Sequence, residues 1–408
     1  MPIAFTVVYN QNSVLSFLNF FIHNYDYDNY FLISIYYKNE PIIQLCNLAS
    51  KILKNVKCLS FESNINWAGP SYFSQNIIMV EYLLRELNWK WNYLINLSET
   101  DFTLVNISYL QSFLGNEDEL FIKYNLFDFT KSQGLDKYFN EVDDNLIFQQ
   151  YREIEKLNVS FKTGSDWFML PRDFLEFALS KENEYLVNFF KNTIHPMESF
   201  YHTLAWNSHF KHRIAWKNFR LINWKRPQGC FCRNKHLCGC SPLALSGHSD
   251  IIYLLEHLEK DQIFFGRKFN PRIDLAFTNL IFTEVIGKTL PRMKFTNISM
   301  SSILPGNFLV TGINGNRNIF TYSYELTDEA KRNYLLEYRK TLNAYLQGKI
   351  EMKEIMSKDE RLPARYNPAE EMKNCTTDDK EVVGADDDIE WIGDDKDSLL
   401  KEFTLPSE

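Results

Sequence analysis

The chain has 408 residues, of which 45% are hydrophobic and 15% aromatic, which is enough apolar material for one large or two ordinary domains and excludes a disordered scaffold. The formal net charge is −8, but residues 369–408 hold 14 acidic and 4 basic side chains, a net of −10, so the rest of the chain is close to neutral at about +2. The sequence contains neither a signal-peptide pattern nor the roughly 18 unbroken apolar residues of a membrane-spanning helix.

The first hundred residues alternate strand-like and helix-like patterns. Runs rich in β-branched and aromatic residues predict strands at 3–9, 30–37 and 91–98, and helical spacing of apolar residues predicts helices at 13–22 and 75–87. This order predicts an α/β fold with a largely parallel sheet flanked by helices, in which ligands bind at the carboxyl ends of the strands. Site residues are therefore expected just after four positions, Tyr9, Tyr37, Asn66 and Ser98.

The middle of the chain, residues 161–269, is dense in Trp, His, Arg and Cys, which indicates a second functional half of the same domain. Residues 166–179 predict a strand, a turn at Pro171 and a helix. The expected domain covers residues 1–274. A diverged region follows at 275–367, in which 328–356 has the pattern of a long amphipathic helix, and residues 368–408 form an acidic tail that we expect to be disordered.

Four of the seven cysteines lie close together, as Cys230-x-Cys232-x5-Cys238-x-Cys240. Zinc knuckles usually have about two to four residues between paired cysteines, so a single intervening residue fits zinc poorly. Two nested bridges, Cys230 to Cys240 and Cys232 to Cys238, suit pairs that face each other across a turn. Disulfides are favoured, with zinc or reduced thiols as alternatives, and disulfides would indicate the lumen of the secretory pathway.

Five glycosylation sequons agree with a lumenal location, although an Asn- and Ser-rich chain also produces them by chance: Asn96, Asn106, Asn158, Asn297 and Asn374. Because Asn96 lies in a predicted strand end, we expect it to remain unmodified.

The segment HPMESFYHTL, residues 195–204, has a proline suited to a first helical turn and places Glu198 in that turn. A helix N-terminus stabilises a carboxylate anion, so we expect Glu198 to be charged and able to accept a proton. A helix-capping carboxylate is the alternative. His195 and His202 are not at the four-residue spacing with which a helix clasps a metal, which argues against a zinc enzyme.

Adjacent cations, Arg267 and Lys268, follow an apolar run in FFGRKFN. Such a pair can neutralise a diphosphate, because Arg offers a planar fork of donors and Lys a point charge. A solvated strand end is the alternative. The sequence has no P-loop or G-x-G-x-x-G motif, and the acidic pair Asp26-x-Asp28 precedes a predicted strand, which is the wrong end for a metal-nucleotide site on a parallel sheet.

Seven segments carry a family resemblance: INWAGPSYFSQ, WNYLINLSETDF, KSQGLDKYF, GSDWFMLPRDFLEFAL, HPMESFYHTL, LINWKRPQGCFCRNKHLCGCSP and IFFGRKF. In order and approximate spacing they resemble the protein (peptide) O-xylosyltransferases, within the glycosyltransferase family that also holds the core-2 branching N-acetylglucosaminyltransferases. The resemblance covers about residues 3–274. The Trp-Lys/Arg segment that runs into C-x-C…C-G-C-S-P is typical of the xylosyltransferase branch.

The resemblance implies a GT-A type domain that moves xylose from UDP-xylose to a serine of a proteoglycan core protein, with inversion, and so initiates glycosaminoglycan (heparan and chondroitin sulfate) linkage synthesis. It implies Glu198 as the catalytic base, Arg267 and Lys268 as the diphosphate-binding pair, and disulfides within the C-x-C…C-x-C segment. It implies further donor contacts at Val8, Ile65, Asn66, Trp67, Asp166, Trp167 and Ser241.

The implied reaction is an in-line displacement in which a base removes the serine proton and UDP leaves from the opposite face. GT-A enzymes usually offset the charge of departing UDP with a metal held by an Asp-x-Asp motif. Because Arg267 and Lys268 can supply that charge, we expect that no metal is required, although a divalent cation can stimulate the reaction. We expect no nucleic-acid partner. The resemblance implies the Golgi or endoplasmic reticulum lumen, with the full-length protein held as a type II membrane protein by an N-terminal anchor and stem that this chain does not contain.

The sequence also departs from the family. Members usually carry a V-H-G-like turn after the first strand and an H-V-D-K/R segment after the second, where this chain has VVYNQN and SIYYKN. Tyr36, in preference to Tyr37, therefore stands near the position of the family's nucleoside-binding Asp. A tyrosine cannot accept two hydrogen bonds as a carboxylate does, although its ring can stack. Two other hypotheses stay open: a branching N-acetylglucosaminyltransferase, which the C-G-C-S-P segment disfavours, and a non-catalytic relative that binds glycan or protein.

Overall fold

The structure is a computed structural model that describes residues 1–9, 13–36, 38–61, 65–66, 68–124, 134–142, 145–224, 227–234 and 237–281. Of residues 227–234 and 237–241 it describes the backbone. The helix predicted at 328–356 and the acidic tail lie outside the described residues. In the described part of the chain, no helix is long and apolar enough to cross a membrane.

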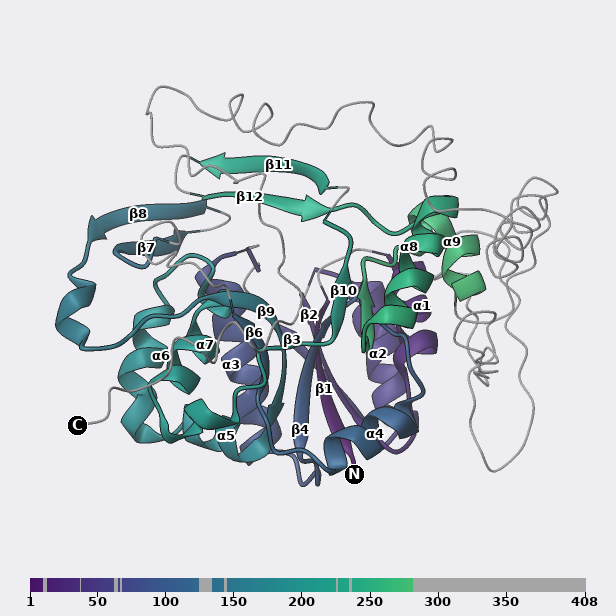
Figure 1. Ribbon diagram of the computed structural model, residues 1–408, viewed down its shortest axis with the longest axis horizontal. Coiled ribbons are helices and arrows are strands. Elements are labelled where there is room, and N and C mark those ends of the chain that lie inside the picture. The colour runs from purple at the N-terminus through teal and green to yellow at the C-terminus, as the bar shows by residue number, and fades with distance from the viewer. Residues whose placement is uncertain are drawn as a thin grey trace.

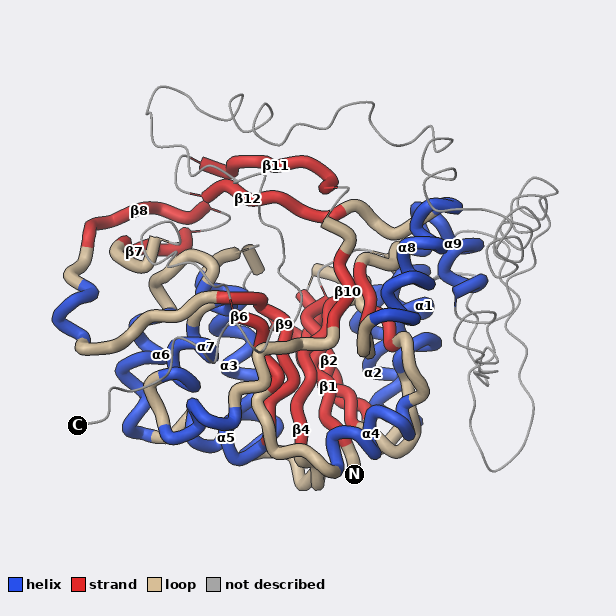
Figure 2. The backbone as a smooth tube through the Cα atoms, viewed as in Figure 1, coloured by secondary structure: helices blue, strands red, loops and turns tan. Residues whose placement is uncertain are grey.

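A six-stranded sheet in the order β3-β2-β1-β4-β9-β6 forms the centre of the molecule (Figures 1 and 2). The strands are β1 (Ile3–Tyr9), β2 (Tyr30–Tyr36), β3 (Val56–Phe61), β4 (Tyr93–Ser98), β6 (Phe121–Tyr124) and β9 (Gly164–Pro171). The four strands from β3 to β4 are parallel, whereas β9 is antiparallel to both of its neighbours. The predicted α/β class with a largely parallel sheet flanked by helices is thus confirmed.

Successive residues of the central strands face opposite sides of the sheet and build two separate cores. In β1, Phe5 and Val7 lie in one core and Ala4 in the other, and in β4 Ile95 and Leu94 divide in the same way. The first core is covered by α1 (Val14–Asn24), α2 (Glu40–Ile52), α4 (Ile107–Gly115), α8 (Gly247–Lys260) and α9 (Pro271–Leu280). The second is covered by α3 (Pro70–Arg85), α5 (Arg172–Ala178), α6 (Glu184–Phe190) and α7 (Phe200–Trp206), so the two groups of helices lie on opposite faces (Figure 1).

The sequence analysis missed α2 and β3, so the strand that it predicted at 91–98 is the fourth of the chain and not the third. Helix α2 buries four residues at helical spacing: Ile42, Leu45, Cys46 and Ala49. Strand β3 is an edge strand that pairs with β2. A disulfide joins Cys46 of α2 to Cys58 of β3, with the two Cα atoms 5.9 Å apart. The sequence analysis did not predict this bridge.

Smaller elements surround the sheet. Two antiparallel hairpins, β7 (Lys137–Val142) with β8 (Asn145–Tyr151) and β11 (Pro227–Asn234) with β12 (Leu237–Pro242), lie at the top of Figure 1, the end toward which β1 runs. A three-stranded sheet contains β5 (Phe102–Thr103), β10 (Arg220–Ile222) and β13 (Phe265–Arg267). The 3₁₀ helices are η1 (Ile154–Leu157), η2 (Lys181–Asn183), η3 (Pro196–Glu198) and η4 (His209–Arg213).

The end of the expected domain falls inside a helix. Helix α9 runs from Pro271 to Leu280 and has a non-helical kink at Asp274, the last residue of the expected domain. Phe277, beyond that boundary, is fully buried in the first core. The structure therefore carries the folded unit a little past residue 274.

Candidate functional site

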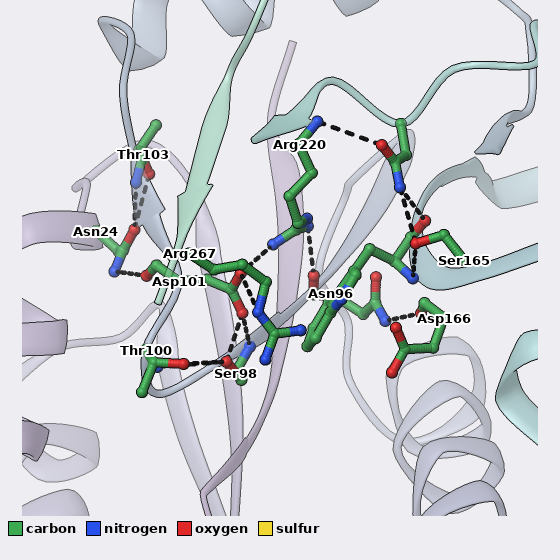
Figure 3. A network of polar contacts seen from close by, with 12 residues as sticks. Asn24, Asn96, Ser98, Thr100, Asp101, Thr103, Ser165, Asp166, Arg220 and Arg267 are labelled. Carbon is green, nitrogen blue, oxygen red and sulfur yellow. Dashed lines mark hydrogen bonds and ion pairs between the residues drawn. The ribbon is translucent and has the colours of Figure 1, made fainter. Parts of the chain in front are cut away.

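Charged and polar side chains gather where β4 ends and β9 begins (Figure 3). Because β9 is antiparallel to β4, with Ile95 opposite Met169, the first residues of β9 lie beside the last residues of β4. The residue that follows Lys268 binds to the same place, since the Phe269 N–H donates to the Thr100 carbonyl at 2.8 Å. Three segments far apart in sequence therefore meet at the carboxyl end of β4, where the sequence analysis expected a site.

The buried carboxylate of Asp101 is the centre of this cluster. One of its oxygens, Oδ2, accepts hydrogen bonds from the backbone N–H of Ser98 at 2.6 Å and from the Ser98 hydroxyl at 2.5 Å. The other, Oδ1, accepts from Nη1 of Arg220 at 2.6 Å and lies 3.7 Å from Nε of Arg267. The side chains of Asp101 and Arg220 are both completely buried. Asp101 thus fixes the loop after β4 and the two arginines at once.

The indole of Trp167 lies against both arginines. The guanidinium carbon of Arg220 is 4.7 Å from its ring centroid, and that of Arg267 is 4.0 Å away. Arg220 also donates from Nη2 to the carbonyl of Asn96 at 3.0 Å. Burial lowers the pKa of Arg220, and the charge and hydrogen bond of Asp101 oppose that shift. Arg220 is therefore held in place as a structural cation.

Arg267 is partly exposed whereas Arg220 is completely buried, although the buried Nε of each lacks a hydrogen-bond partner within the described residues. The side chain of Arg267 is 13% exposed. Buried donors are nearly always paired in folded proteins, so an unpaired one calls for an explanation. A partly exposed guanidinium can offer its planar fork of donors to an anion.

Lys268 and Glu99 are partly exposed and have pKa values near neutrality. Burial, together with the charge of Arg267, lowers the pKa of Lys268 to about 8, so its ammonium is mostly charged at pH 7. Burial raises the pKa of Glu99 to about 7, and Arg267 and Lys268 oppose that rise. Asp101 and Asp166 also act on these two cations, so Arg267 and Lys268 lie in a cluster of mixed charge at the carboxyl end of β4.

Asp166 lies between the predicted base and the predicted diphosphate pair. Burial and the charge of Glu198 raise its pKa to about 6, while the charge of Arg267 acts in the opposite direction. Its backbone carbonyl accepts a hydrogen bond from Nδ2 of Asn96 at 2.7 Å (Figure 3). Asn96 is 3% exposed, and with its Nδ2 so engaged it agrees with the expectation that this sequon remains unmodified.

Glu198 occupies a different helical context from the predicted one. Pro196 does begin a helix, but this is the three-residue 3₁₀ helix η3, which ends at Glu198. Ser199 has non-helical dihedral angles, and α7 begins at Phe200. A single 3₁₀ turn adds few aligned peptide dipoles, so the predicted support from a helix dipole is weak here. Oε1 of Glu198 instead lies 3.6 Å from Nδ1 of His195, and its side chain is 32% exposed.

The structure puts some of the remaining predicted donor contacts at the site and does not describe others. Val8 pairs with Ser98 in the register of β1 and β4, which puts it at the site, and Ile65 is buried. The side-chain amide of Asn66 donates to Glu141, whose carboxylate also accepts from the Ser71 N–H at 2.7 Å in the first turn of α3. Trp67 and Tyr37 lie outside the described residues, and Ser241 lies in β12, where the side chains are not described.

Tyr36, which the resemblance sets near the position of the family's Asp, is the last residue of β2. Its ring lies 6.0 Å from the ring of Phe61, and Nζ of Lys38 lies 5.8 Å from its centroid. An aromatic ring and a cation thus meet at the carboxyl end of β2. This combination can stack on a planar group but offers no carboxylate.

The cysteine-rich segment forms the hairpin β11-β12. Its backbone register sets Cys230 opposite Cys240 and Cys232 opposite Cys238, as the nested arrangement requires. The sulfur atoms lie outside what the structure describes, so the bridges themselves stay a prediction.

Sequence reasoning missed Asp101, Arg220 and the supporting residues Asn218 and Ser165. The amide of Asn218 donates to the Ser165 hydroxyl at 2.9 Å. Asp101 lies in the segment WNYLINLSETDF, and its position three residues after the end of a predicted strand was a usable signal. Arg220 offered none, because its partner is 119 residues away in sequence.

Among the residues that the structure describes, no three or more His, Cys, Asp or Glu side chains are grouped so that they could hold a metal ion. The pair Asp26 and Asp28 forms a turn ahead of β2, because Oδ1 of Asp26 accepts from the Asp28 N–H at 2.9 Å and from Nδ2 of Asn29 at 2.7 Å. His202 is buried against the Lys123 carbonyl at 3.1 Å, and burial lowers its pKa to about 4.

Residues 3–246 match the family model described as Core-2/I-Branching enzyme. The chain is 36% identical over 222 residues to "Xylosyltransferase oxt" of Drosophila pseudoobscura pseudoobscura, covering 52% of this chain and 25% of that protein. It is 30% identical over 253 residues to "Xylosyltransferase sqv-6" of Caenorhabditis briggsae, covering 58% and 31%, and 28% identical over 316 residues to "Xylosyltransferase 1" of Mus musculus, covering 75% and 31%. The chain therefore spans about a quarter to a third of the length of these relatives.

Proposed function

Because the chain belongs to the Core-2/I-branching enzyme family, we propose that it is a xylosyltransferase that moves xylose from UDP-xylose to a serine hydroxyl of a core protein and so initiates glycosaminoglycan linkage synthesis. The relatives named above are xylosyltransferases, which supports the choice of sugar. The observation that carries the proposal is the meeting of a proton acceptor, Glu198, with a partly exposed cation, Arg267, on either side of Asp166.

This arrangement supplies what an inverting transfer needs. Glu198 accepts the proton of the serine hydroxyl while the serine oxygen forms a bond to C1 of xylose. The bond from C1 to the diphosphate oxygen breaks on the opposite face, and UDP leaves with both bonding electrons. The proton ends on the carboxylate of Glu198 and the negative charge on UDP, so the step is balanced.

The counter-charge for departing UDP comes, in this proposal, from Arg267 and Lys268. The side chain of Arg267 is partly exposed and is oriented by Asp101 and the ring of Trp167. Preorganised cations of this kind stabilise developing charge in the transition state without a metal. We therefore propose that a divalent cation is not required for the chemical step.

We also propose that the protein works in an oxidising lumen, the Golgi or endoplasmic reticulum. The disulfide Cys46–Cys58 supports this, because structural disulfides persist in oxidising compartments. The facing cysteines of the β11-β12 hairpin support it further. Mass spectrometry of unreduced, alkylated peptides tests the location: Cys46 linked to Cys58 is expected, and fully alkylatable thiols in protein from a secretory host would contradict it.

Donor binding and transfer test the proposed function together. Calorimetric titration is expected to show binding of UDP-xylose in preference to UDP-N-acetylglucosamine, and a Ser-Gly peptide is expected to gain one pentose by mass. Preference for UDP-N-acetylglucosamine with transfer of that sugar would instead identify a branching enzyme. Absence of binding to either nucleotide sugar would indicate a non-catalytic relative, in which Tyr36 in place of the family's Asp has abolished donor binding.

A further inference from the structure

His195, the residue before Pro196, is held in an unusual backbone conformation. Its dihedral angles are φ 47 and ψ 41, in the left-handed region that residues with a Cβ rarely adopt. Its N–H donates to the Ala68 carbonyl at 2.8 Å, and its own carbonyl accepts from the Glu198 N–H at 3.1 Å. Both hydrogen bonds of the backbone fix His195 between the start of α3 and the turn that carries Glu198.

This conformation sets the imidazole beside the Glu198 carboxylate. Nδ1 of His195 lies 3.6 Å from Oε1 of Glu198, which is within ion-pair range but longer than a good hydrogen bond. The side chain of His195 is 15% exposed, half the exposure of Glu198. The more buried member of the pair is therefore the imidazole, and the carboxylate lies on the solvent side, where a substrate arrives.

The charges around His195 favour its protonated form. Burial by itself lowers the pKa of His195, but the charges of Glu198 and Asp166 outweigh burial and raise it. Glu198 lies on the same turn and Asp166 on β9, which packs against η3. Helix α3, which also packs against η3, brings Tyr72 to Asp166, but burial and the charge of Asp166 raise the pKa of Tyr72 so far that it stays neutral. Among these described neighbours, His195 is thus the cation that faces two carboxylates.

We propose that His195 is a positioning residue for Glu198: its imidazolium holds Oε1 and leaves Oε2 to meet the acceptor hydroxyl. This inference rests on the proposed role of Glu198 as the base. The imidazolium is present below the raised pKa of His195 and is lost as the pH rises through it. The contribution of His195 is therefore largest on the acid side of the activity profile and fades at alkaline pH.

The test compares His195→Asn with wild type across pH. Asn adopts the left-handed conformation more readily than most residues, so the variant keeps the turn and removes the charge. We expect kcat/KM for xylose transfer to fall about tenfold at pH 6, to approach the wild-type value near pH 9, and UDP-xylose affinity to stay within about twofold. The matched control is His212→Asn, because His212 is exposed on η4, away from the site. It should follow the wild-type profile.

A loss of kcat/KM by the same factor at every pH, or no loss, would overturn the inference. A second measurement does not depend on activity: NMR titration of ring-labelled histidines should show the pKa of His195 falling in Glu198→Gln. An unchanged His195 pKa in that variant would equally refute the coupling. If the folded wild-type protein transfers no xylose while the NMR titration shows the coupling, the proposed function fails and the pairing of His195 with Glu198 stands.

Discussion

Asp101→Asn isolates the buried ion pair on which the site is built. The substitution keeps the shape of the side chain but leaves the completely buried guanidinium of Arg220 without a counter-ion. Breaking such a pair from one side costs about 3–5 kcal/mol, or roughly 10²- to 10⁴-fold in the unfolding equilibrium, because an uncompensated charge remains in the interior. Arg267 loses the same partner, so we also expect weaker UDP binding in the fraction that stays folded.

The assay is urea unfolding followed by tryptophan fluorescence, with Asp118→Asn as the matched control. Asp118 forms an ion pair with Arg213 at 3.6 Å, but its side chain is 81% exposed, and exposed pairs contribute about 0–1 kcal/mol. Arg213 also keeps a second partner, Asp173, at 2.7 Å. If both variants unfold at the same urea concentration, the reasoning that the Asp101 pair organises the site is refuted.

Three further substitutions, at Gly164, Arg267 and Lys268, give testable expectations. Gly164→Ala should destabilise the fold by about 3 kcal/mol, as measured by urea unfolding. The reason is steric, because a Cβ there would lie 2.0 Å from the Lys123 carbonyl oxygen and 2.5 Å from Nε2 of His202. Wild-type stability of this variant would show that β6 moves aside freely. Arg267→Ala should weaken UDP binding in calorimetry by about tenfold or more. EDTA should leave wild-type transfer intact. Activity that is lost in EDTA and restored by manganese would show that the counter-charge is a metal. The pKa of Lys268 is about 8, so its charge is lost as the pH rises through that value. UDP affinity should therefore fall between pH 7 and 9 in wild type and fall less in Lys268→Arg, because Arg keeps its charge. Parallel pH dependence in both proteins would remove Lys268 from the diphosphate site.

The strands and helices with strong periodic patterns could be predicted from the sequence. Strand β1 has the predicted bounds of residues 3–9, and β9 and α5 meet at the predicted turn at Pro171. Helix α2 was missed even though its buried residues have helical spacing, and β3 was missed because a short edge strand with half-exposed side chains gives a weak alternating pattern. Local patterns therefore predicted most of the central strands, but not every helix with a clear apolar face.

The site residues likewise fall into two groups, those that the sequence indicated and those that only the fold reveals. Glu198 and Arg267 were singled out from local sequence patterns and Asp166 came from the family resemblance, and the structure brings their charges within reach of one another. The pairing of Asp101 with Arg220, the disulfide Cys46–Cys58 and the contact of His195 with Glu198 depend on which side chains the fold brings together. No spacing rule in the sequence marks the first two contacts, whereas His195 and Glu198 stand three residues apart, a spacing at which side chains on a helical turn can meet. The left-handed backbone of His195 is also set by its long-range bond to Ala68, which the sequence does not reveal.

The central claim is that Glu198 is the base, and Glu198→Gln tests it most directly. Gln keeps the shape of the side chain and a hydrogen-bonding oxygen but cannot accept the serine proton. Transfer to a Ser-Gly peptide and UDP-xylose affinity should be measured side by side for the variant and for wild type. The account predicts unchanged UDP-xylose affinity with turnover lower by about 10²-fold or more. Near-normal turnover per folded molecule, with at most a small loss of stability, would contradict it and leave Glu198 as a structural residue of the turn before α7.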